Sequence, residues 1–397
     1  MSSTLLQHSR LHGRPCDLRI RDGRVAELRF RDEPGTPDLA PVAGEEVLVG
    51  GMITPPLAEP HVHLDAALLG PRAPNRSGTL REGIANWSRL RPTLTVDDVV
   101  DRARRTVAMY RDWGCLRVRT HVDTGSRLAV ETLLGLRSEL AVEGTELQVV
   151  AFPQEGILRA PGQRQAWEEA VALGCDAVGA IPHYERTTEE CWESVRMAFA
   201  LAERQGCAVD LHCDETDDPG SRNLEVVCAQ TLDRGMQGKV VAGHCTSMHS
   251  QPDAYADKVC RLVAQADVMV VCNPLDNVVL QGRYDGYPKR RGLTRVDELW
   301  EVGATVGIGH DSVMDPWYRL GTANLMDAAS MAVHVCQLTA EAQLQRAVRT
   351  LFDENHGPWG GPPPIAKGQP ARLLWWAQDD EIEVLRLRPR PRVFDGT

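Results

Sequence analysis

The sequence lacks the features that mark a membrane or secreted protein. It contains no run of about 18 apolar residues, the length that a membrane-spanning helix needs. Its first residues, MSSTLLQHSRLHGRP, have no apolar core of the kind found in a signal peptide. The 11 cysteines include no C-x-x-C pair, and most lie in apolar runs typical of buried thiols in a reduced compartment. We therefore expect a cytoplasmic protein.

The sequence also lacks an excess of basic residues. Its 44 lysines and arginines stand against 55 aspartates and glutamates, which gives a formal net charge of −11 at pH 7. A protein that binds nucleic acid needs a basic face, so the charge balance argues against such a partner. A chain of 397 residues can form two or three domains, or one barrel with a smaller appended domain.

Eight short apolar runs, each ending in polar side chains, recur between residues 55 and 312. Longer segments with helical spacing of apolar residues separate them, such as TVDDVVDRARRTVAMYRDWG. Strands that alternate with helices predict a parallel sheet, and eight strands close a (β/α)8 TIM barrel, whose reactive residues follow the carboxyl ends of the strands. The runs are LAEPHVHLD, LRVRTHVD, LQVVAFPQE, AVGAIPH, AVDLHCDE, KVVAGHC, VMVVCNP and TVGIGHDS.

The two ends of the chain follow a different pattern. The segment CDLRIRDGRVAELRF alternates apolar and polar residues around Asp22-Gly23, a strong hairpin signal. The segment GQPARLLWWAQDDEIEVLRLR is interpreted as strands around a turn, with the alternating arginines from Arg386 to Arg392 on a solvent face. Neither end can bury a sheet face alone, so we expect both to form one small β-sandwich domain. The predicted domains are residues 1–51 with 352–397 for the sandwich, and residues 52–351 for the barrel.

Four histidines and an aspartate stand at the ends of predicted strands. His61 and His63 are two residues apart, so on a strand both side chains point to the same face. His212 ends the fifth run, His244 the sixth and Asp311 the eighth. A lone histidine is most often a structural hydrogen-bonding group, but this set suits a divalent metal such as zinc, iron or manganese. If the barrel forms, the five side chains meet at its mouth.

The pattern resembles that of the amidohydrolase superfamily and, within it, the bacterial cytosine deaminase family. The resemblance covers most of residues 54–336, whereas the terminal segments resemble the family's composite sandwich only loosely. The segments that carry the resemblance are PPLAEPHVHLD, RTHVD, AFPQEGIL, VGAIPH, HCDETDD, GHCTSMHS, NPLDNVVLQGRYDGYPKRRGLTRV and GHDSVMDPWYRLGTAN.

The resemblance implies a single catalytic metal ion, Fe²⁺ or Zn²⁺. It also implies a homo-oligomer that acts on a free nucleobase, by hydrolytic deamination of a cytosine-type pyrimidine with release of ammonia. Such a metal lowers the pKa of water from near 16 toward about 7, which makes a nucleophile available at neutral pH. The implied ligands are His61, His63, His212 and Asp311.

Further roles follow from the same resemblance. Glu215 matches the acid that handles protons at the pyrimidine ring, and His244, with Asp311, matches the groups that activate water. Gln154 matches the amide that reads the N1 and carbonyl edge of the ring, which suits a group able to donate and accept at once. Trp317 matches an aromatic wall of the pocket.

One position departs from the family. In typical cytosine deaminases the metal-binding aspartate is followed by a second aspartate that reaches into the pyrimidine pocket, and here that position is Ser312. Compared with typical cytosine deaminases, we expect this wall of the pyrimidine pocket to carry one formal charge fewer. We also expect it to leave more space beside C5 of the ring. A single methyl group in a fitted pocket changes selectivity by about 1–3 kcal/mol. The substitution therefore predicts tolerance of, or preference for, 5-methylcytosine, with Ser312 as a substrate-binding residue.

Several other polar residues are expected to support the site. His121 and Asp123 end the second run, and we expect them to pack at the barrel mouth and not to bind the metal. Asp214 is expected to point away from Glu215, and His183 is given no role.

Two alternatives to the cytosine reading remain. The same catalytic groups could act on isocytosine, isoguanine, creatinine or an N-alkylated aminotriazine. The hydrolases of N-alkylated aminotriazines also lack the second aspartate. A protein of another class, a non-catalytic barrel scaffold, should have lost a metal ligand or the acid, and none is missing here.

Overall fold

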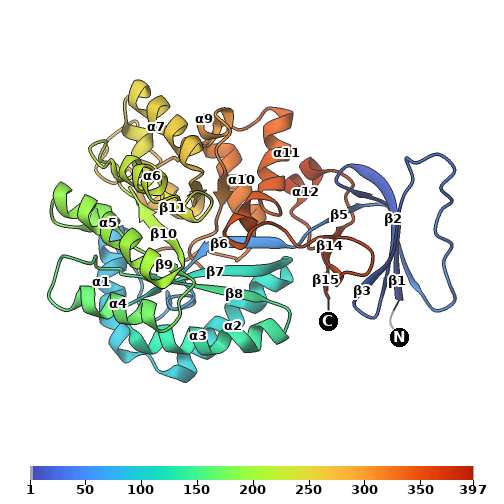
Figure 1. Ribbon diagram of the computed structural model, residues 1–397, viewed down its shortest axis with the longest axis horizontal. Coiled ribbons are helices and arrows are strands. Elements are labelled where there is room, and N and C mark those ends of the chain that lie inside the picture. The colour runs from blue at the N-terminus through green and yellow to red at the C-terminus, as the bar shows by residue number, and fades with distance from the viewer. Residues whose placement is uncertain (1–2, 397) are drawn as a thin grey trace.

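Eight parallel strands form the larger of two sheets in the computed structural model, which describes residues 3–396 (Figure 1). Their order in the sheet follows their order in the chain, from β6 to β13, as a (β/α)8 barrel requires. Each predicted run contains one of them, although β9 is only two residues long. The strands are β6 (Leu57–Val62), β7 (Cys115–Asp123), β8 (Glu146–Phe152), β9 (Ala177–Val178), β10 (Ala208–Cys213), β11 (Val240–His244), β12 (Met269–Cys272) and β13 (Val306–Ile308).

Helices surround this sheet on its outer side (Figure 1). Their apolar faces join the strands in one continuous core that includes Trp167 and Phe199. Caps fix several boundaries: the Thr187 hydroxyl accepts from Glu190 N, and Gly206, at φ 68°, ends the same helix. The barrel helices are α1 (Leu80–Leu90), α2 (Val96–Asp112), α3 (Arg127–Val142), α4 (Gln163–Ala172), α5 (Thr188–Gln205), α6 (Asn223–Asp233), α7 (Asp253–Ala266), α8 (Pro274–Leu280), α9 (Val296–Glu301), α10 (Leu325–Val335) and α11 (Glu341–Thr350).

The first and last barrel strands, β6 and β13, meet at a junction that we call the seam. At its carboxyl end, Asp311 N donates to His61 O at 2.9 Å. Further down, the buried Asn355 side chain accepts from Ile308 N and donates to Ala58 O and Ile308 O, each at 2.8 Å. Glu59 accepts from His61 N at 2.9 Å and from His310 N at 3.1 Å. Side chains therefore supply much of the hydrogen bonding that closes the barrel here.

Strands from both ends of the chain form the second sheet, which makes the smaller lobe in Figure 1. Asp22 and Gly23 have φ of 46° and 70° and join two antiparallel strands, as the hairpin signal predicts. The sheet covers a separate apolar cluster that contains Leu6, Leu18 and Leu373. Its strands are β1 (Ser3–Leu11), β2 (Arg14–Arg21), β3 (Arg24–Phe30), β4 (Glu46–Val49), β5 (Met52–Thr54), β14 (Arg372–Trp376) and β15 (Arg392–Asp395).

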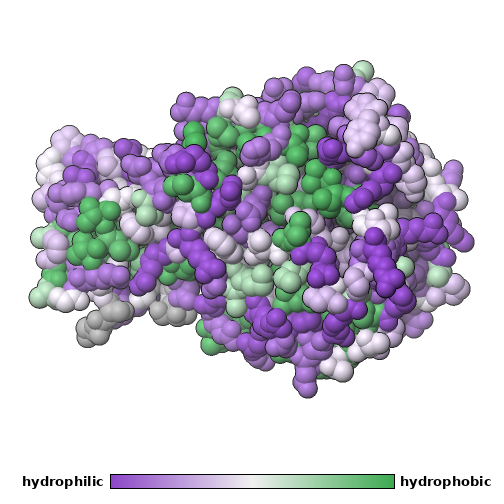
Figure 2. All heavy atoms as spheres, turned by 180° about the vertical axis from the view of Figure 1, so that it is seen from behind, coloured by the Kyte–Doolittle hydropathy of each residue, from purple (hydrophilic) through white to green (hydrophobic). Residues whose placement is uncertain are grey.

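One prediction for the C-terminal segment is wrong. Residues Glu381–Leu387 form helix α12, where the sequence predicted a strand with arginines on its solvent face. The Asp380 carboxylate accepts from Glu383 N and caps this helix, and an acidic first turn with Arg386 in the last turn suits the helix dipole. Among the described residues, no helix has both the length and the apolar character needed to cross a membrane. Figure 2 shows a mostly polar surface on the far face, with hydrophobic residues in small groups.

Candidate active site

The four predicted metal ligands converge at the carboxyl end of the barrel. His212 Nε2 lies 3.2 Å from His61 Nε2 and 3.1 Å from His63 Nε2. Asp311 Oδ1 lies 3.8 Å from His61 Nε2 and 3.7 Å from His63 Nε2. Donor atoms around a tetrahedral ion with bonds of about 2.1 Å are about 3.4 Å apart, so these separations fit one divalent ion. The donor set of imidazoles and one carboxylate suits zinc or iron.

The protonation states also suit a metal site. Burial lowers the pKa of His61 and His212, and it lowers that of His63 to about 3, so all three imidazoles are neutral. His63 Nδ1 lies 3.1 Å from the carbonyl oxygen of His121 and donates to it, which leaves Nε2 free to bind a metal. Burial, followed by the nearby Asp276 and other acids, raises the pKa of Asp311. A cation bound beside these acids would favour the charged form of Asp311 and so lower its pKa again.

The predicted proton-transfer groups lie beside these ligands. His244 Nδ1 is 3.7 Å from Glu215 Oε1 and 3.8 Å from Asp311 Oδ2, so His244 stands between the two acids. Burial raises the pKa of Glu215 to about 8 and lowers the pKa of His244, so near neutral pH the acid is protonated and the imidazole is neutral. His244 and Asp311 have φ of 69° and 68°, a strained left-handed conformation that turns each side chain at the end of its strand.

Aromatic rings form one side of the site. The Trp317 ring lies with its centroid 6.0 Å from that of His63 and 6.3 Å from that of Trp87. Trp87 is buried, and its Nε1 donates to Asp123 Oδ2 at 2.7 Å. Gln154, the predicted reader of the ring edge, is buried just after the end of β8. Asp123 therefore supports the aromatic side of the site.

Beside Ser312 the structure places a second acid, Asp276, which the sequence analysis did not predict. Ser312 Oγ donates to Asp276 Oδ2 at 2.6 Å, and both side chains are buried. Helix α8 places the carboxyl group of Asp276 directly beside the serine, and burial, followed by the nearby Asp315, raises the pKa of this carboxyl group. The available signal was a single acidic residue in the apolar stretch NPLDNVVL, directly after the seventh strand.

Other polar residues position the reacting groups. Asn277 Nδ2 lies 3.1 Å from His244 Nδ1. His183, for which no role was predicted, accepts from Glu215 N at 3.4 Å. Asp214 points away from Glu215, as predicted, and accepts from Ser221 Oγ at 2.6 Å and Leu224 N at 2.9 Å. These contacts hold the loop after β10 on the barrel rim.

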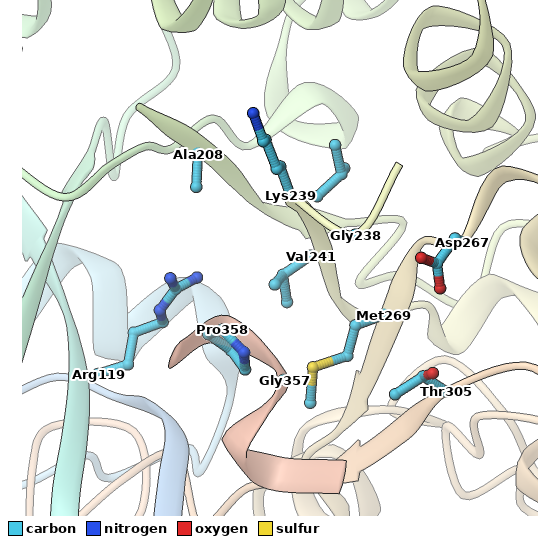
Figure 3. Close-up of a pocket in the computed structure, with 11 residues that line it drawn as sticks. Arg119, Ala208, Gly238, Lys239, Val241, Asp267, Met269, Thr305, Gly357 and Pro358 are labelled. Carbon is cyan, nitrogen blue, oxygen red and sulfur yellow. The ribbon is translucent and has the colours of Figure 1, made fainter. Parts of the chain in front are cut away.

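A buried polar chain runs from the histidines to the opposite end of the barrel. His121 Nε2 lies 3.1 Å from Asp210 Oδ1, and Arg119 Nη1 donates to Asp210 Oδ2 at 2.6 Å. His121 also shares a possible donor cluster with His61 and His212, whose ligand atoms lie within 4.8 Å of one another. Arg119 reaches a cavity of about 210 Å³ at the amino ends of the strands, drawn in Figure 3. The cavity lies at the end opposite to the predicted ligands.

The barrel and its cluster of three histidines and an aspartate define a class, that of hydrolases built around a divalent metal at the carboxyl ends of barrel strands. The chain belongs to the amidohydrolase family, which it matches over residues 77–351. This confirms the superfamily to which the sequence was assigned, and it makes the protein a hydrolase of C–N bonds.

One solved structure and two further named proteins that are similar to this chain agree with this assignment. The crystal structure of 5-methylcytosine deaminase from Klebsiella pneumoniae liganded with 5-fluorocytosine is 37% identical, with a TM-score of 0.91, and the match covers 99% of this chain and 96% of that one. Pterin deaminase of Rhizobium rhizogenes (strain K84) is 28% identical over 82% of this chain and 74% of that protein. N-isopropylammelide isopropyl amidohydrolase of Pseudomonas sp. (strain ADP) is 23% identical over 83% of this chain and 78% of that protein. Deaminase or amidohydrolase activity is thus common to the named relatives.

Proposed function

We propose that this enzyme hydrolytically deaminates a free cytosine-type pyrimidine base, cytosine or 5-methylcytosine, and releases ammonia with uracil or thymine. The observation that carries the proposal is the placement of a protonated Glu215 and a neutral His244 within 3.7 Å of each other, beside Asp311. The likeness to 5-methylcytosine deaminase, at 37% identity over nearly the whole chain, supports the same class of substrate.

The reaction needs an added water, a proton for the ring nitrogen and a protonated leaving amine. His244 and Asp311 are placed to accept the proton that the attacking water loses as its oxygen bonds to C4. Glu215 gives its proton to N3, so that the ring becomes a neutral tetrahedral adduct. The proton taken from water then passes to the exocyclic amine, the C4–N bond breaks and ammonia leaves. The new carbonyl forms at C4 as its hydroxyl proton returns to the carboxylate of Glu215.

A divalent ion held by His61, His63, His212 and Asp311 would supply the nucleophile by lowering the pKa of water toward about 7. The remaining work falls to the protein side chains. Gln154 can donate to the C2 carbonyl and accept from N1–H, which fixes the ring in one orientation. Trp317 covers a ring face, and closure of the pocket by aromatic and aliphatic groups keeps competing water out.

The replacement by Ser312 supports a preference for the 5-methyl base, because serine is shorter than aspartate. Steady-state rates of ammonia release from cytosine and 5-methylcytosine test this directly. We expect kcat/KM for 5-methylcytosine to equal or exceed that for cytosine. A kcat/KM more than about tenfold higher for unsubstituted cytosine contradicts the preference but leaves the deaminase assignment intact.

A second candidate is the same chemistry on another aminated ring. Asp276 gives this wall an acidic group, which suits a ring with an additional N–H beside the reacting carbon, as in isocytosine. A screen of aminopyrimidines, aminopurines and aminotriazines with Fe²⁺-loaded and Zn²⁺-loaded protein decides between the candidates. The choice of metal, the cytoplasmic location and the homo-oligomer remain predictions.

A further inference from the structure

Gln154 lies at the corner of a tight turn beside the predicted metal ligands. The ring of Phe152, at the end of β8, stacks on the His212 ring with centroids 3.9 Å apart, and Gln154 follows two residues later. A hydrogen bond of 2.8 Å from Gly156 N to Pro153 O closes the turn. Among the described residues, no hydrogen bond involves the side chain of Gln154. Its position therefore depends on how the turn itself is held.

Arg91 joins this turn to the aromatic side of the pocket. The residue directly follows helix α1, and its guanidinium lies between two carboxylates. Arg91 Nη1 donates to Asp123 Oδ2 at 2.6 Å, and Arg91 Nη2 lies 3.6 Å from Oε2 of Glu155, the residue after Gln154. The Arg91 side chain is only 17% exposed, so both ion pairs are partly shielded from water. A planar guanidinium with five N–H donors is suited to bridging two acids.

The same two carboxylates also bind the last turn of α1. Trp87 Nε1 donates to the Asp123 oxygen that accepts from Arg91, at 2.7 Å. Ser88 Oγ donates to Glu155 Oε1 at 2.8 Å. Because Trp87 packs beside Trp317, the end of α1 is connected both to the aromatic side of the pocket and to the turn.

A glycine makes room for the guanidinium. A Cβ atom at Gly125 would lie 2.3 Å from Arg91 Nη1 and 2.7 Å from Arg91 Cζ. Gly125 N donates to Asp123 Oδ1 at 2.9 Å, so the other oxygen of Asp123 remains for Arg91 and Trp87. The φ of Gly125 lies outside the left-handed region, so its backbone accommodates an alanine. An alanine at this position would displace the Arg91 side chain without removing its charge.

We propose that Arg91 is a positioning residue that couples the Gln154 turn to the Trp87 and Trp317 rings, and so fixes the distance between the two sides of the substrate pocket. The inference rests on the proposed function, in which Gln154 binds the edge of the ring and Trp317 covers a face. Both contacts hold the ring in the ground state and in the transition state alike. Loss of Arg91 should therefore weaken substrate binding more than it slows the chemical step.

Steady-state kinetics of Arg91→Ala, Arg91→Lys and Gly125→Ala with cytosine and 5-methylcytosine test the coupling. Arg91→Ala should raise KM about five- to tenfold, the effect of one lost hydrogen bond, and leave kcat within about threefold of wild type. Arg91→Lys should raise KM by a similar factor, because an ammonium group lacks the planar fork that reaches two carboxylates. Gly125→Ala should also raise KM, although Arg91 is still present.

Double variants show whether Arg91 acts through both sides of the pocket. Arg91→Ala is combined with Glu155→Gln, which weakens the link to the turn, and separately with Trp87→Phe, which removes the N–H bound to Asp123. Each double variant should raise KM by less than the product of the two single effects, because the two changes break one shared network. Effects that multiply fully in either pair overturn the inference.

Arg105→Ala serves as the matched control, since Arg105 on α2 forms an exposed ion pair with Asp101 at 3.2 Å. It should leave KM within about twofold of wild type. Thermal midpoints and metal content show whether each variant is folded and loaded, and a smaller folded fraction lowers the apparent kcat but not KM. A folded, loaded Arg91→Ala whose KM stays within about twofold of wild type overturns the inference but not the proposed function. A wild-type protein that releases no ammonia from either base contradicts the proposed function, and the inference falls with it.

Discussion

His61 and Asp311 face each other across the seam of the barrel: the backbone N of Asp311 donates to the backbone O of His61 at 2.9 Å, and their side chains lie 3.8 Å apart at His61 Nε2 and Asp311 Oδ1. One residue belongs to the first barrel strand and the other follows the last. A metal bound by both side chains would therefore join the two edges of the sheet. Metal binding and barrel closure should be coupled, since a ligand that binds only the folded state stabilises it.

Removal of the metal should destabilise the protein. An ion present at 1,000 times its dissociation constant contributes about 4 kcal/mol to the free energy of unfolding. We expect chelation to lower the thermal midpoint by several degrees and added Fe²⁺ or Zn²⁺ to restore it, as followed by calorimetry. His63→Ala should retain little metal by elemental analysis, whereas a variant of the exposed His334, His334→Gln, should retain as much as wild type. Full metal occupancy in His63→Ala would exclude the predicted ligand set.

The Asn355 side chain should be necessary for closure of the seam. Asn355→Ala leaves Ile308 N, Ile308 O and Ala58 O without their partner, and each unpaired buried group costs about 1–3 kcal/mol. Denaturant titration should show a loss of about 3 kcal/mol or more in the free energy of unfolding. Asn324→Ala, which removes the N-cap of α10, should cost only about 1 kcal/mol. Equal losses in the two variants would contradict a special role for Asn355.

Gly83 allows helix α1 to approach the ring of Trp317. A Cβ atom at Gly83 would lie 2.5 Å from Trp317 Cδ1, so Gly83→Ala must displace the indole. We expect KM for the substrate to rise about tenfold, the effect of about 1.4 kcal/mol of lost binding. Gly135→Ala in α3 is the matched control, because nothing lies within 4 Å of its Cβ position. It should leave KM unchanged and stabilise the helix by about 0.5–1 kcal/mol. An unchanged KM in Gly83→Ala would argue that Trp317 does not line the substrate pocket.

Glu215→Gln should abolish proton transfer to the ring and leave the fold intact. General acid–base groups typically contribute about 10²–10⁴-fold to the rate, so kcat should fall by that factor. Metal content and thermal midpoint should stay close to wild type, since glutamine has the same shape and Glu215 is not a predicted ligand. A variant with kcat within tenfold of wild type would rule out the acid role.

His356 should make the protein less stable in mild acid. Burial lowers its pKa from 6.5 to about 4, so the unfolded chain binds a proton on this side chain at a higher pH than the folded protein does. The neutral form of His356 contributes fully to the free energy of unfolding above pH 6.5. This contribution is lost as the pH falls from 6.5 to 4, at up to about 1.4 kcal/mol per pH unit. In His356→Gln the free energy of unfolding should depend less steeply on pH in this window. Equal slopes in the wild type and His356→Gln would contradict this role of His356.

The sequence was sufficient to predict the barrel because each strand ends where its apolar run meets polar residues, and this pattern is local. The same pattern placed His212, His244 and Asp311 at the barrel mouth. Helix α12 was missed because alternating apolar residues and arginines mimic a strand, and only the cap at Asp380 reveals the helix.

Contacts between segments that are distant in the chain could not be predicted from the sequence. Asp276 and Ser312 are 36 residues apart, and Asn355 and Ala58 are 297 apart. No periodicity in the sequence relates such positions, because the packing of the complete barrel brings them together. The contact between Asp276 and Ser312 therefore became visible only in the folded structure.

The seam also sets the order in which the site can assemble during synthesis. His61 and His63 leave the ribosome early and His212 follows, but Asp311 comes about a hundred residues after His212. Asn355, which holds the other end of the junction, is made later still. A nascent chain therefore carries three imidazoles without their carboxylate, and a metal can be fully enclosed only when the last quarter of the barrel has been made.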